Sequence, residues 1–550
     1  MPSRRTLVIV SVLVVAVVVV VGLLLPSLGA ARRSVNTGVL PGSLPEPTAL
    51  SAVAGDFSGG GYGFPSAPPA GPFDREAYDR IDDNPFRRVS ESPLSTFSVD
   101  VDTASYANTL RFLDNGQEVP KDAVRIEEFI NAFGYGYTPP ASGADAPLAA
   151  RLAVAACPWA PDHKLVRVAL KGREVAAADR PAANLVFLLD TSGSMNDPDK
   201  LPLVKRAVFT LLPSLRSDDR LAVVTYAGSA GVALPSTPGD ERAAIEEAVR
   251  VLEPAGGTRG SAGIERAYEI ARENRIDGGI NRVILATDGD FNLGTTDRGS
   301  LTRLIEEEAA TGVGLTVLGF GTGNYNDAGM EELSNLGDGN YAYVSSAREA
   351  ERVLGSQVGG TLQTIAKDVK LQVEFNPAAV EAYRLIGYEN RVLADADFND
   401  DRKDAGDVGA GHEVTAFYEV VPAGGDVPGA GPPVDELKYQ EGATPAGAAP
   451  AGELLTVKLR WKQPDAPKEQ GTSELAEFTL KDADAAFEDA DPAFRFAAAV
   501  AGWGMLLRGS EHRGEVDAGW IAETAEAASG EMDPADRDRR EGFLAAVRGG

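Results

Sequence analysis

The segment Leu185-Val-Phe-Leu-Leu-Asp-Thr-Ser-Gly-Ser194 decides the fold of this chain. Its five apolar residues have the length and composition of a buried strand, and they end directly in the carboxylate of Asp190. Hydroxyls follow at Ser192 and Ser194, and a helix pattern begins just beyond, at Asp199-Lys200. This loop predicts a site for a small divalent cation, because such ions prefer hard oxygen ligands.

Two further loops complete the predicted site. Gly256-Gly257 precedes Thr258, and the apolar run Arg282–Thr287 ends at Asp288. The arrangement resembles the von Willebrand factor type A (VWA) domain, whose metal-ion-dependent adhesion site takes D-x-S-x-S, a Thr and an Asp from three loops. The resemblance implies Mg²⁺ (or Mn²⁺ or Ca²⁺), held so that one coordination position stays open for a partner's carboxylate. The matching residues are Asp190, Ser192, Ser194, Thr258 and Asp288.

The region from about Ala183 to Ala366 predicts an α/β fold, a doubly wound, Rossmann-like parallel sheet with helices on both faces. In such sheets ligands bind beyond the carboxyl ends of the strands, which is where the cation loops fall. The predicted strands are Leu185–Asp190, Leu221–Tyr226, Arg282–Thr287, Leu315–Phe320, Val232–Leu234 and Tyr341–Val344. The predicted helices are Leu201–Leu215, Glu241–Leu252, Ser261–Arg272, Leu301–Ala310 and Ala347–Ile365.

Composition and connection lengths divide the chain into five predicted parts. Residues 1–33 are a membrane anchor or signal segment, and 34–83 are a Gly/Pro/Ser-rich spacer. An α+β N-terminal module at 84–180, the VWA domain at 181–366 and a β-rich and helical C-terminal module at 367–550 follow. Because the connections between these last three are short, we expect them to pack as one body.

The segments on either side of the VWA-like region resemble the flanking modules of bacterial YfbK-type proteins. The resemblance implies an architecture rather than an activity. Many of these proteins carry a lipid-accepting cysteine, which this chain lacks, because its one cysteine, Cys157, lies far from the N-terminal segment. The stretches that carry the resemblance are Asn84–Val89, Ser95–Tyr106, Arg125–Asn131, Arg384–Asn390, Asp397–Asp401 and Ala410–Thr415.

The apolar run Leu7–Leu25 predicts the cellular location. As a helix, roughly 19 residues at ~1.5 Å each approach the ~30 Å hydrocarbon core of a membrane, and the run exceeds the ~7–15 apolar residues usual in cleaved signals. We therefore expect a single-pass anchor in the cell membrane, with the soluble part outside the cytoplasm in the cell envelope. Two alternatives stay open: secretion after signal cleavage at the small residues 27–31, and a cytoplasmic soluble part, since arginines flank both ends of the run.

Charge and missing motifs exclude several functions. A formal net charge of −29 argues against nucleic acid as a partner. The sequence holds no P-loop, H-E-x-x-H or G-x-S-x-G, and its three histidines, His163, His412 and His512, are scattered. The acidic run Asp395–Asp401 lacks the Gly and Glu of a calcium loop. We therefore expect no enzymatic activity and no catalytic residue.

One acidic motif admits a second interpretation. Asp100-Val-Asp102-Thr103 superficially resembles the nucleophile loop of haloacid-dehalogenase-type phosphatases. The further Lys and acidic pair that such a site needs cannot be placed in this sequence, so we interpret Asp102 or Thr103 as the N-cap of a helix at Ala104–Leu113.

Three functional hypotheses follow from these patterns. The leading one is a divalent-cation-dependent protein-binding or scaffold protein, whose unknown protein partner supplies an Asp or Glu carboxylate to the cation. The second is an assembly or chaperone-like factor that works with a partner ATPase, since this chain carries no nucleotide motif of its own. The third is a metal-dependent hydrolase, which would need a positioned base beside the cation.

Overall fold

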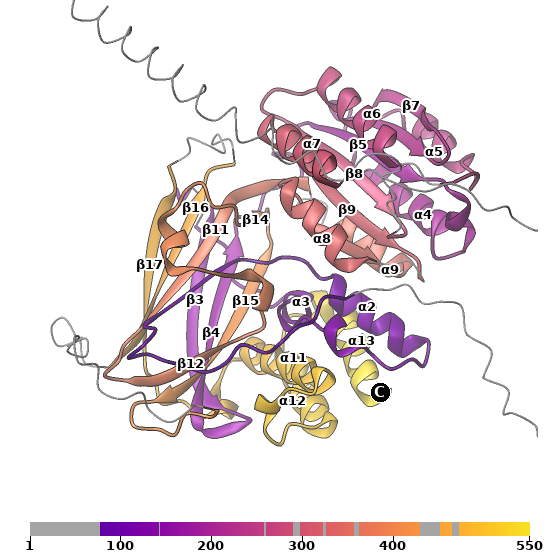
Figure 1. The fold of residues 1–550 in the computed structure, drawn as a ribbon. Coiled ribbons are helices and arrows are strands. Elements are labelled where there is room, and N and C mark those ends of the chain that lie inside the picture. The colour runs from indigo at the N-terminus through magenta and orange to yellow at the C-terminus, as the bar shows by residue number, and fades with distance from the viewer. Residues whose placement is uncertain are drawn as a thin grey trace, which may run out of the picture. The chain divides into compact units, whose positions relative to one another are not determined.

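The computed structural model describes residues 78–141, 143–257, 260–289, 298–322, 326–356, 362–429, 452–464 and 472–549, and these residues all belong to one compact unit of the chain. A six-stranded sheet fills its VWA-like region in the order β10-β9-β8-β5-β6-β7 (Figure 1). Neighbouring strands are parallel except β7, which is an antiparallel edge. The strands are β5 Ala183–Asp190, β6 Arg220–Tyr226, β7 Ala230–Pro238, β8 Ile280–Thr287, β9 Gly314–Phe320 and β10 Tyr341–Val344.

The central strand β5 is buried along its whole length. Leu185, Phe187 and Leu189 face one hydrophobic cluster, and Val186 and Leu188 face a second cluster on the other side of the sheet. Burying each of these side chains stabilises the fold by about 1.5–3 kcal/mol relative to leaving it exposed. Strand order reverses between β5 and its neighbours β6 and β8, so the loops after β5 and β8 open at the switch point where ligands bind in such sheets.

The helices of this region cover both faces of the sheet (Figure 1). Most were predicted within a few residues, but the end of the helix predicted at Ala347–Ile365 is wrong. Within the described residues, an α-helical turn and a π-helical turn, Arg352–Ser356, form there, and a strand already begins at Thr364. The helices are α4 Leu201–Leu211, α5 Arg242–Arg250, α6 Gly260–Glu273, α7 Arg298–Ala310, α8 Asp327–Leu336 and α9 Ala347–Glu351.

The segments before and after the VWA-like region share two antiparallel sheets. The first has the order β1-β12-β15-β4-β3 and the second β13-β2-β11-β16-β17, with β14 also paired to β11. Their inner faces enclose one hydrophobic cluster. The strands are β1 Arg87–Arg88, β2 Leu94–Ser98, β3 Leu148–Cys157, β4 Ala160–Gly172, β11 Thr364–Phe375, β12 Val380–Ile386, β13 Val392–Leu393, β14 Gly406–Gly409, β15 Glu413–Pro422, β16 Glu453–Lys462 and β17 Glu474–Lys481.

Pairing in these sheets joins strands that are far apart in the chain. β4 pairs with β15, and β2 pairs with β11, so each sheet needs strands from both sides of the VWA-like region. The VWA domain is therefore an insertion into a β-sandwich, and the two flanking segments build one body between them.

A helical layer covers the outer face of the first sheet (Figure 1). α11 begins after Asp491, whose side chain accepts a hydrogen bond from the amide of Phe494, and it ends at Gly509 with φ +70°. Ala104 and Ala107 of α2 also pack against Tyr341 and Tyr343 of the VWA sheet. The helices are α2 Ala104–Asp114, α3 Ile126–Asn131, α11 Pro492–Arg508, α12 Ala518–Glu531 and α13 Arg537–Gly549.

The predicted membrane localisation is corrected by the structure. Within the described residues, no helix combines the length and apolar character that a membrane crossing requires. The longest, α11, has 17 residues, or about 26 Å, against a hydrocarbon core of about 30 Å. The apolar run Leu7–Leu25, on which the prediction depended, lies outside the described residues. Single-pass membrane anchoring is therefore not supported.

Candidate metal centre

The first loop of the site follows β5 directly. Asp190 ends the strand with none of its surface exposed, and one carboxylate oxygen, Oδ1, accepts a hydrogen bond from the Ser192 amide at 2.8 Å. The hydroxyls of Ser192 and Ser194 lie 2.9 Å apart and share a hydrogen bond. The strand end and the turn after it thus bring the three oxygen-bearing side chains of the D-x-S-x-S motif together.

The second loop lies against the first through backbone hydrogen bonds. The Gly193 amide donates to the Gly256 carbonyl at 3.0 Å, and the Ala255 amide donates to the Thr191 carbonyl at 2.8 Å. Gly256 has a φ of +80°, which favours glycine at this turn. Thr258, the predicted ligand of this loop, lies outside the described residues.

The third loop supplies Asp288, which follows the last residue of β8 and is fully buried. Because β8 pairs in parallel with β5, the two strands end on the same edge of the sheet. Lys200 reaches this carboxylate from the start of α4, with Nζ 2.9 Å from Oδ2 of Asp288. The lysine side chain is itself only 5% exposed, so the pair is shielded from solvent.

The stem of Lys200 runs past Gly321, just after β9. A Cβ at this glycine would overlap the lysine stem, and its φ of +74° also favours glycine. The hydroxyl of Tyr343 donates to the Gly321 carbonyl at 2.7 Å and holds this backbone in place. The path of the lysine to Asp288 is therefore built into the fold.

The electrostatics of the site centre on Asp190. Burial raises the pKa of Asp190 to about 6, and the charge of Asp288 adds to this rise, whereas hydrogen bonds from Ser192 and the Tyr226 hydroxyl lower it. Oδ2 of Asp190 accepts no hydrogen bond from the described residues within ordinary bonding distance. A buried carboxylate oxygen in this state, beside two hydroxyls and a second carboxylate, fits a divalent cation with oxygen ligands.

Two features of this region were not predicted from the sequence. Lys200 was placed only at a helix start, because nothing in its local pattern shows that its side chain reaches Asp288. Of the two predicted caps, Thr103 is the N-cap residue of α2, without a capping hydrogen bond to its side chain, whereas Asp102 joins Asp100 and Glu331 in a buried cluster of carboxylates within 4.8 Å of one another. The only sequence signal for this cluster is that Asp100 and Asp102 lie in a stretch that resembles the YfbK-type N-terminal module.

The strand order and the loop set define the class of this protein: it carries a VWA domain. A family model described as "von Willebrand factor type A domain" matches residues 184–355. One described as "Uncharacterized protein YfbK, C-terminal" matches residues 360–548, and one described as "von Willebrand factor" matches residues 72–167. The VWA match and the YfbK C-terminal match agree with the resemblances read from the sequence.

The particular family follows from a curated relative. Protein YfbK of Escherichia coli (strain K12) is 42% identical over 464 residues, which cover 83% of this chain and 78% of that protein. The chain therefore belongs to the YfbK family. Protein sll0103 of Synechocystis sp. is 30% identical over 190 residues, which are 34% of this chain and 44% of that protein.

Solved structures also match. A von Willebrand factor type A protein from Catenulispora acidiphila matches 76% of this chain and 98% of its own, with 18% identity and a TM-score of 0.38. The match to the ArnB paralog VWA2 from Sulfolobus acidocaldarius covers 73% of this chain and 97% of that protein's chain, with 15% identity and a TM-score of 0.33.

Proposed function

We propose that this protein binds another protein through a divalent cation at the carboxyl edge of its VWA sheet. Asp190, Ser192, Ser194, Thr258 and Asp288 would hold the cation, with Mg²⁺ as the expected occupant because few charged ligands and retained water suit it. The bound cation would supply a positive charge at the surface, and a partner's Asp or Glu carboxylate would complete its coordination.

One observation carries this proposal. No donor among the described residues lies within ordinary bonding distance of the buried Oδ2 of Asp190, and the paired hydroxyls of Ser192 and Ser194 lie beside it. A buried carboxylate with an unpaired oxygen destabilises a fold unless a proton or a cation compensates its charge. The fold thus keeps a costly arrangement that a cation would relieve.

The contact between Lys200 and Asp288 adds a second element. The ammonium holds the Asp288 carboxylate at a fixed position beneath the site and neutralises part of its charge. With Asp288 compensated in this way, Asp190 and the two serines remain to bind the cation most directly.

An interaction role agrees with membership of a VWA family, and we propose it ahead of a hydrolase. Hydrolysis at a metal needs a general base placed beside the reacting water. Asp290, two residues after Asp288, is the nearest acidic residue that could act as that base, and it lies outside the described residues. The lack of enzymatic activity therefore stays a prediction.

Calorimetry of the full chain tests the cation site. We expect uptake of one Mg²⁺ by the wild type after treatment with chelator and its loss in Asp190→Ala. Asp197→Ala is the matched control, since Asp197 lies in the same loop but is exposed and outside the ligand set. Unchanged uptake in Asp190→Ala would exclude the site.

Affinity purification tests the role of the cation in binding. Partners recovered in Mg²⁺ should be lost in chelator and in the Ser192→Ala/Ser194→Ala double variant, and kept in Asp197→Ala. Recovery of the same partners by the double variant, with and without chelator, would mean that binding occurs elsewhere on the molecule.

A further inference from the structure

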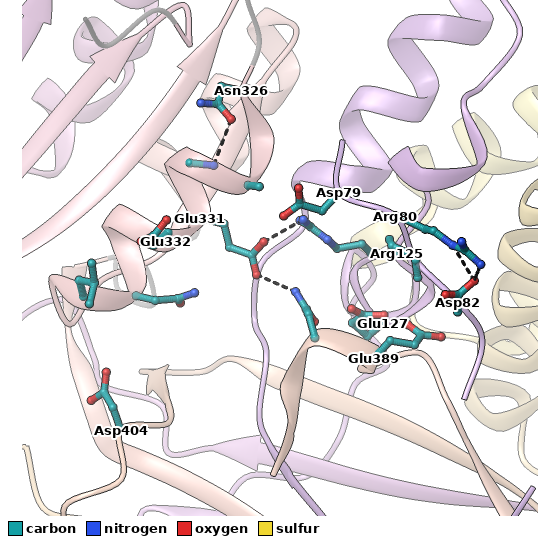
Figure 2. A pocket seen from close by; sticks show the side chains of 16 residues that line it. Asp79, Arg80, Asp82, Arg125, Glu127, Asn326, Glu331, Glu332, Glu389 and Asp404 are labelled. Atoms are coloured by element: carbon teal, nitrogen blue, oxygen red, sulfur yellow. Dashed lines mark hydrogen bonds and ion pairs between the residues drawn. The ribbon is translucent and has the colours of Figure 1, made fainter. Parts of the chain in front are cut away.

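A second acidic region lies where the VWA domain meets the β-sandwich and its helices. A cavity of about 680 Å³ opens there between α8, α3, residues 79–82 and the 3₁₀ turn Glu389–Arg391 (Figure 2). Its volume lies within the range of ligand pockets, roughly 300–1,000 Å³. The cavity is thus large enough to hold a side chain or a small organic molecule.

The lining of this cavity is strongly acidic. Seven lining residues carry carboxylates and two, Arg80 and Arg125, carry guanidiniums. Arg125 already faces Glu128, Asp327 and Glu331 at 2.8–3.0 Å. Arg80 pairs with Asp82 at an exposed position, where solvent screens the pair. Both guanidiniums therefore face carboxylates of the chain itself, and the wall of the cavity keeps a net negative charge.

The buried ion network behind the cavity also contains more carboxylates than guanidiniums. Arg391 faces Asp100, Asp102 and Glu331, at 3.1, 3.4 and 2.8 Å. Together with the three partners of Arg125, five carboxylates share two guanidiniums, since Glu331 contacts both. These groups lie in a low dielectric, where uncompensated charge costs most. Burial raises the pKa of Asp102, Glu128 and Glu331, so any further positive charge near this network would be stabilised.

Glu127 is the observation that points to a ligand. It belongs to α3, lines the cavity and is 1% exposed, yet its Oε2 accepts no hydrogen bond from the residues in the described ranges. The backbone of Gly387 passes close to this oxygen, and only glycine fits there, because a Cβ would lie 2.7 Å from Oε2. Burial, and then the charges of Glu389 and Asp100, raise the pKa of Glu127 to about 7. The charge of Arg508 and a hydrogen bond from the Tyr388 backbone lower this pKa, so the donor that a ligand could supply is the one that Oε2 lacks.

Glu389 stands beside Glu127 at the same wall (Figure 2). Its carboxylate accepts a hydrogen bond from Arg508 at 2.5 Å, which anchors the turn to α11. Glu332, also in the lining, is an exposed residue of α8. The cavity therefore has carboxylates on elements from each of the parts that meet here.

We propose that this cavity binds a cationic nitrogen group, an ammonium or a guanidinium, carried by a lysine or arginine side chain of a partner polypeptide. Such a group donates hydrogen bonds to carboxylates and would compensate Glu127 and Glu389 together. A metal ion fits less well, because it needs several oxygens at about 2.0–2.6 Å, and the tightest carboxylate cluster is already occupied by Arg391. The proposal does not depend on the cation site of the VWA domain.

Fluorescence anisotropy with the full chain tests this proposal. The probe is a labelled decapeptide of alternating glycine and lysine, and its glutamine counterpart is the uncharged control. We expect the lysine peptide to bind and Glu127→Gln to weaken it about tenfold or more, while the glutamine peptide does not bind. Asp190→Ala should leave this binding unchanged, which separates it from the cation site.

Matched variants guard against two artefacts. Glu332→Lys places a cation at the exposed rim and should abolish binding without disturbing the core, even if Glu127→Gln were to fold poorly. Glu246→Gln and Glu246→Lys make the same charge changes at an exposed position of α5 and should change affinity less than about twofold. Equal effects of the Glu246 and cavity variants would show that the peptide binds only to the net charge of −29, and would overturn the proposal.

Two competitors identify the source of the nitrogen group. If spermidine binds in a Glu127-dependent way and the peptide does not, the cavity still recognises a cationic nitrogen group, but its ligand is a small polyamine rather than a polypeptide. If calcium binds in a Glu127-dependent way and neither the lysine peptide nor spermidine binds, the proposal is wrong and the cavity is a metal site.

Discussion

Two regions of the molecule bury carboxylates but balance their charge differently. One is the set of proposed metal loops of the VWA domain. The other is the junction, the region around Arg125 and Arg391 where the VWA domain meets the β-sandwich and its helices. At the VWA loops, the ammonium of Lys200 pairs with Asp288, while Asp190 lies beside serine hydroxyls that can act as cation ligands. At the junction, five carboxylates share two guanidiniums, and Glu127 adds a further buried acid. The first arrangement underlies the proposed metal site, and the second underlies the proposed site for a cationic nitrogen group.

The largest expected effect is at the junction. Arg125→Met would leave Glu128, Asp327 and Glu331 without their shared guanidinium, and removal of one partner from a buried ion pair costs about 3–5 kcal/mol. We expect a loss near the upper end of this range in urea unfolding at pH 7. The matched control is Arg250→Met, an exposed pair with Glu247 that should change stability little. A similar small change in both variants would mean that the junction is already neutralised by protons.

The next effect separates the VWA loops from the junction. Lys200→Met keeps an apolar stem beside Gly321 but leaves the buried Asp288 without its ammonium, which we expect to cost about 3 kcal/mol in chelator. Added Mg²⁺ should then raise the melting temperature of this variant more than that of the wild type, because the cation binds only the folded state. Arg125→Met should show no such rescue. Equal responses of the two variants to Mg²⁺ would erase the distinction between the regions.

A smaller effect is expected in the dependence of stability on pH. The pKa of Glu127 is raised to about 7, so the folded chain binds more protons than the unfolded chain between about pH 4.5 and 7. The free energy of unfolding should therefore fall as pH rises through this window, by up to about 3 kcal/mol from this group. Glu127→Gln should flatten the profile and be more stable than the wild type at pH 7. Parallel profiles for the two proteins would assign the titration to other groups.

The smallest effect concerns the serines of the VWA loop. Ser192→Ala/Ser194→Ala removes one hydrogen bond between hydroxyls, which is worth about 0.5–1.5 kcal/mol, so the stability of the cation-depleted chain should barely change. Mg²⁺ uptake should nevertheless fall strongly in calorimetry. A large loss of stability in chelator would instead give these serines a structural role.

The sequence predicted the VWA domain well because its signals are local. β5 is an unbroken apolar run that ends at the first ligand, and the order of strands and helices follows directly from such runs. The sequence also showed which residues carry the D-x-S-x-S motif. It did not show Lys200 at Asp288, because that contact joins residues 88 positions apart through a path past Gly321.

The β-sandwich was harder to predict for the same physical reason. Its strands were recognised, but the pairing of β4 with β15 and of β2 with β11 leaves no local pattern, since register depends on faces that meet only in the fold. The helix predicted to reach Ile365 is wrong because β11 begins at Thr364 and pairing in the sheet takes precedence over a weak helical period. The junction network, whose members come from distant segments, was likewise outside the reach of pattern reasoning.

The insertion of the VWA domain between β4 and β11 has a consequence for biosynthesis. β4 leaves the ribosome about 240 residues before β15, its neighbour in the sheet. At about 5–20 residues per second, β3 and β4 wait roughly 10–50 s with one edge unpaired, whereas the inserted domain, whose strands and helices are contiguous, can fold within that interval. An unpaired strand edge invites pairing with other chains. We therefore expect the nascent N-terminal hairpin, rather than the VWA domain, to be the part of this chain that most depends on chaperones.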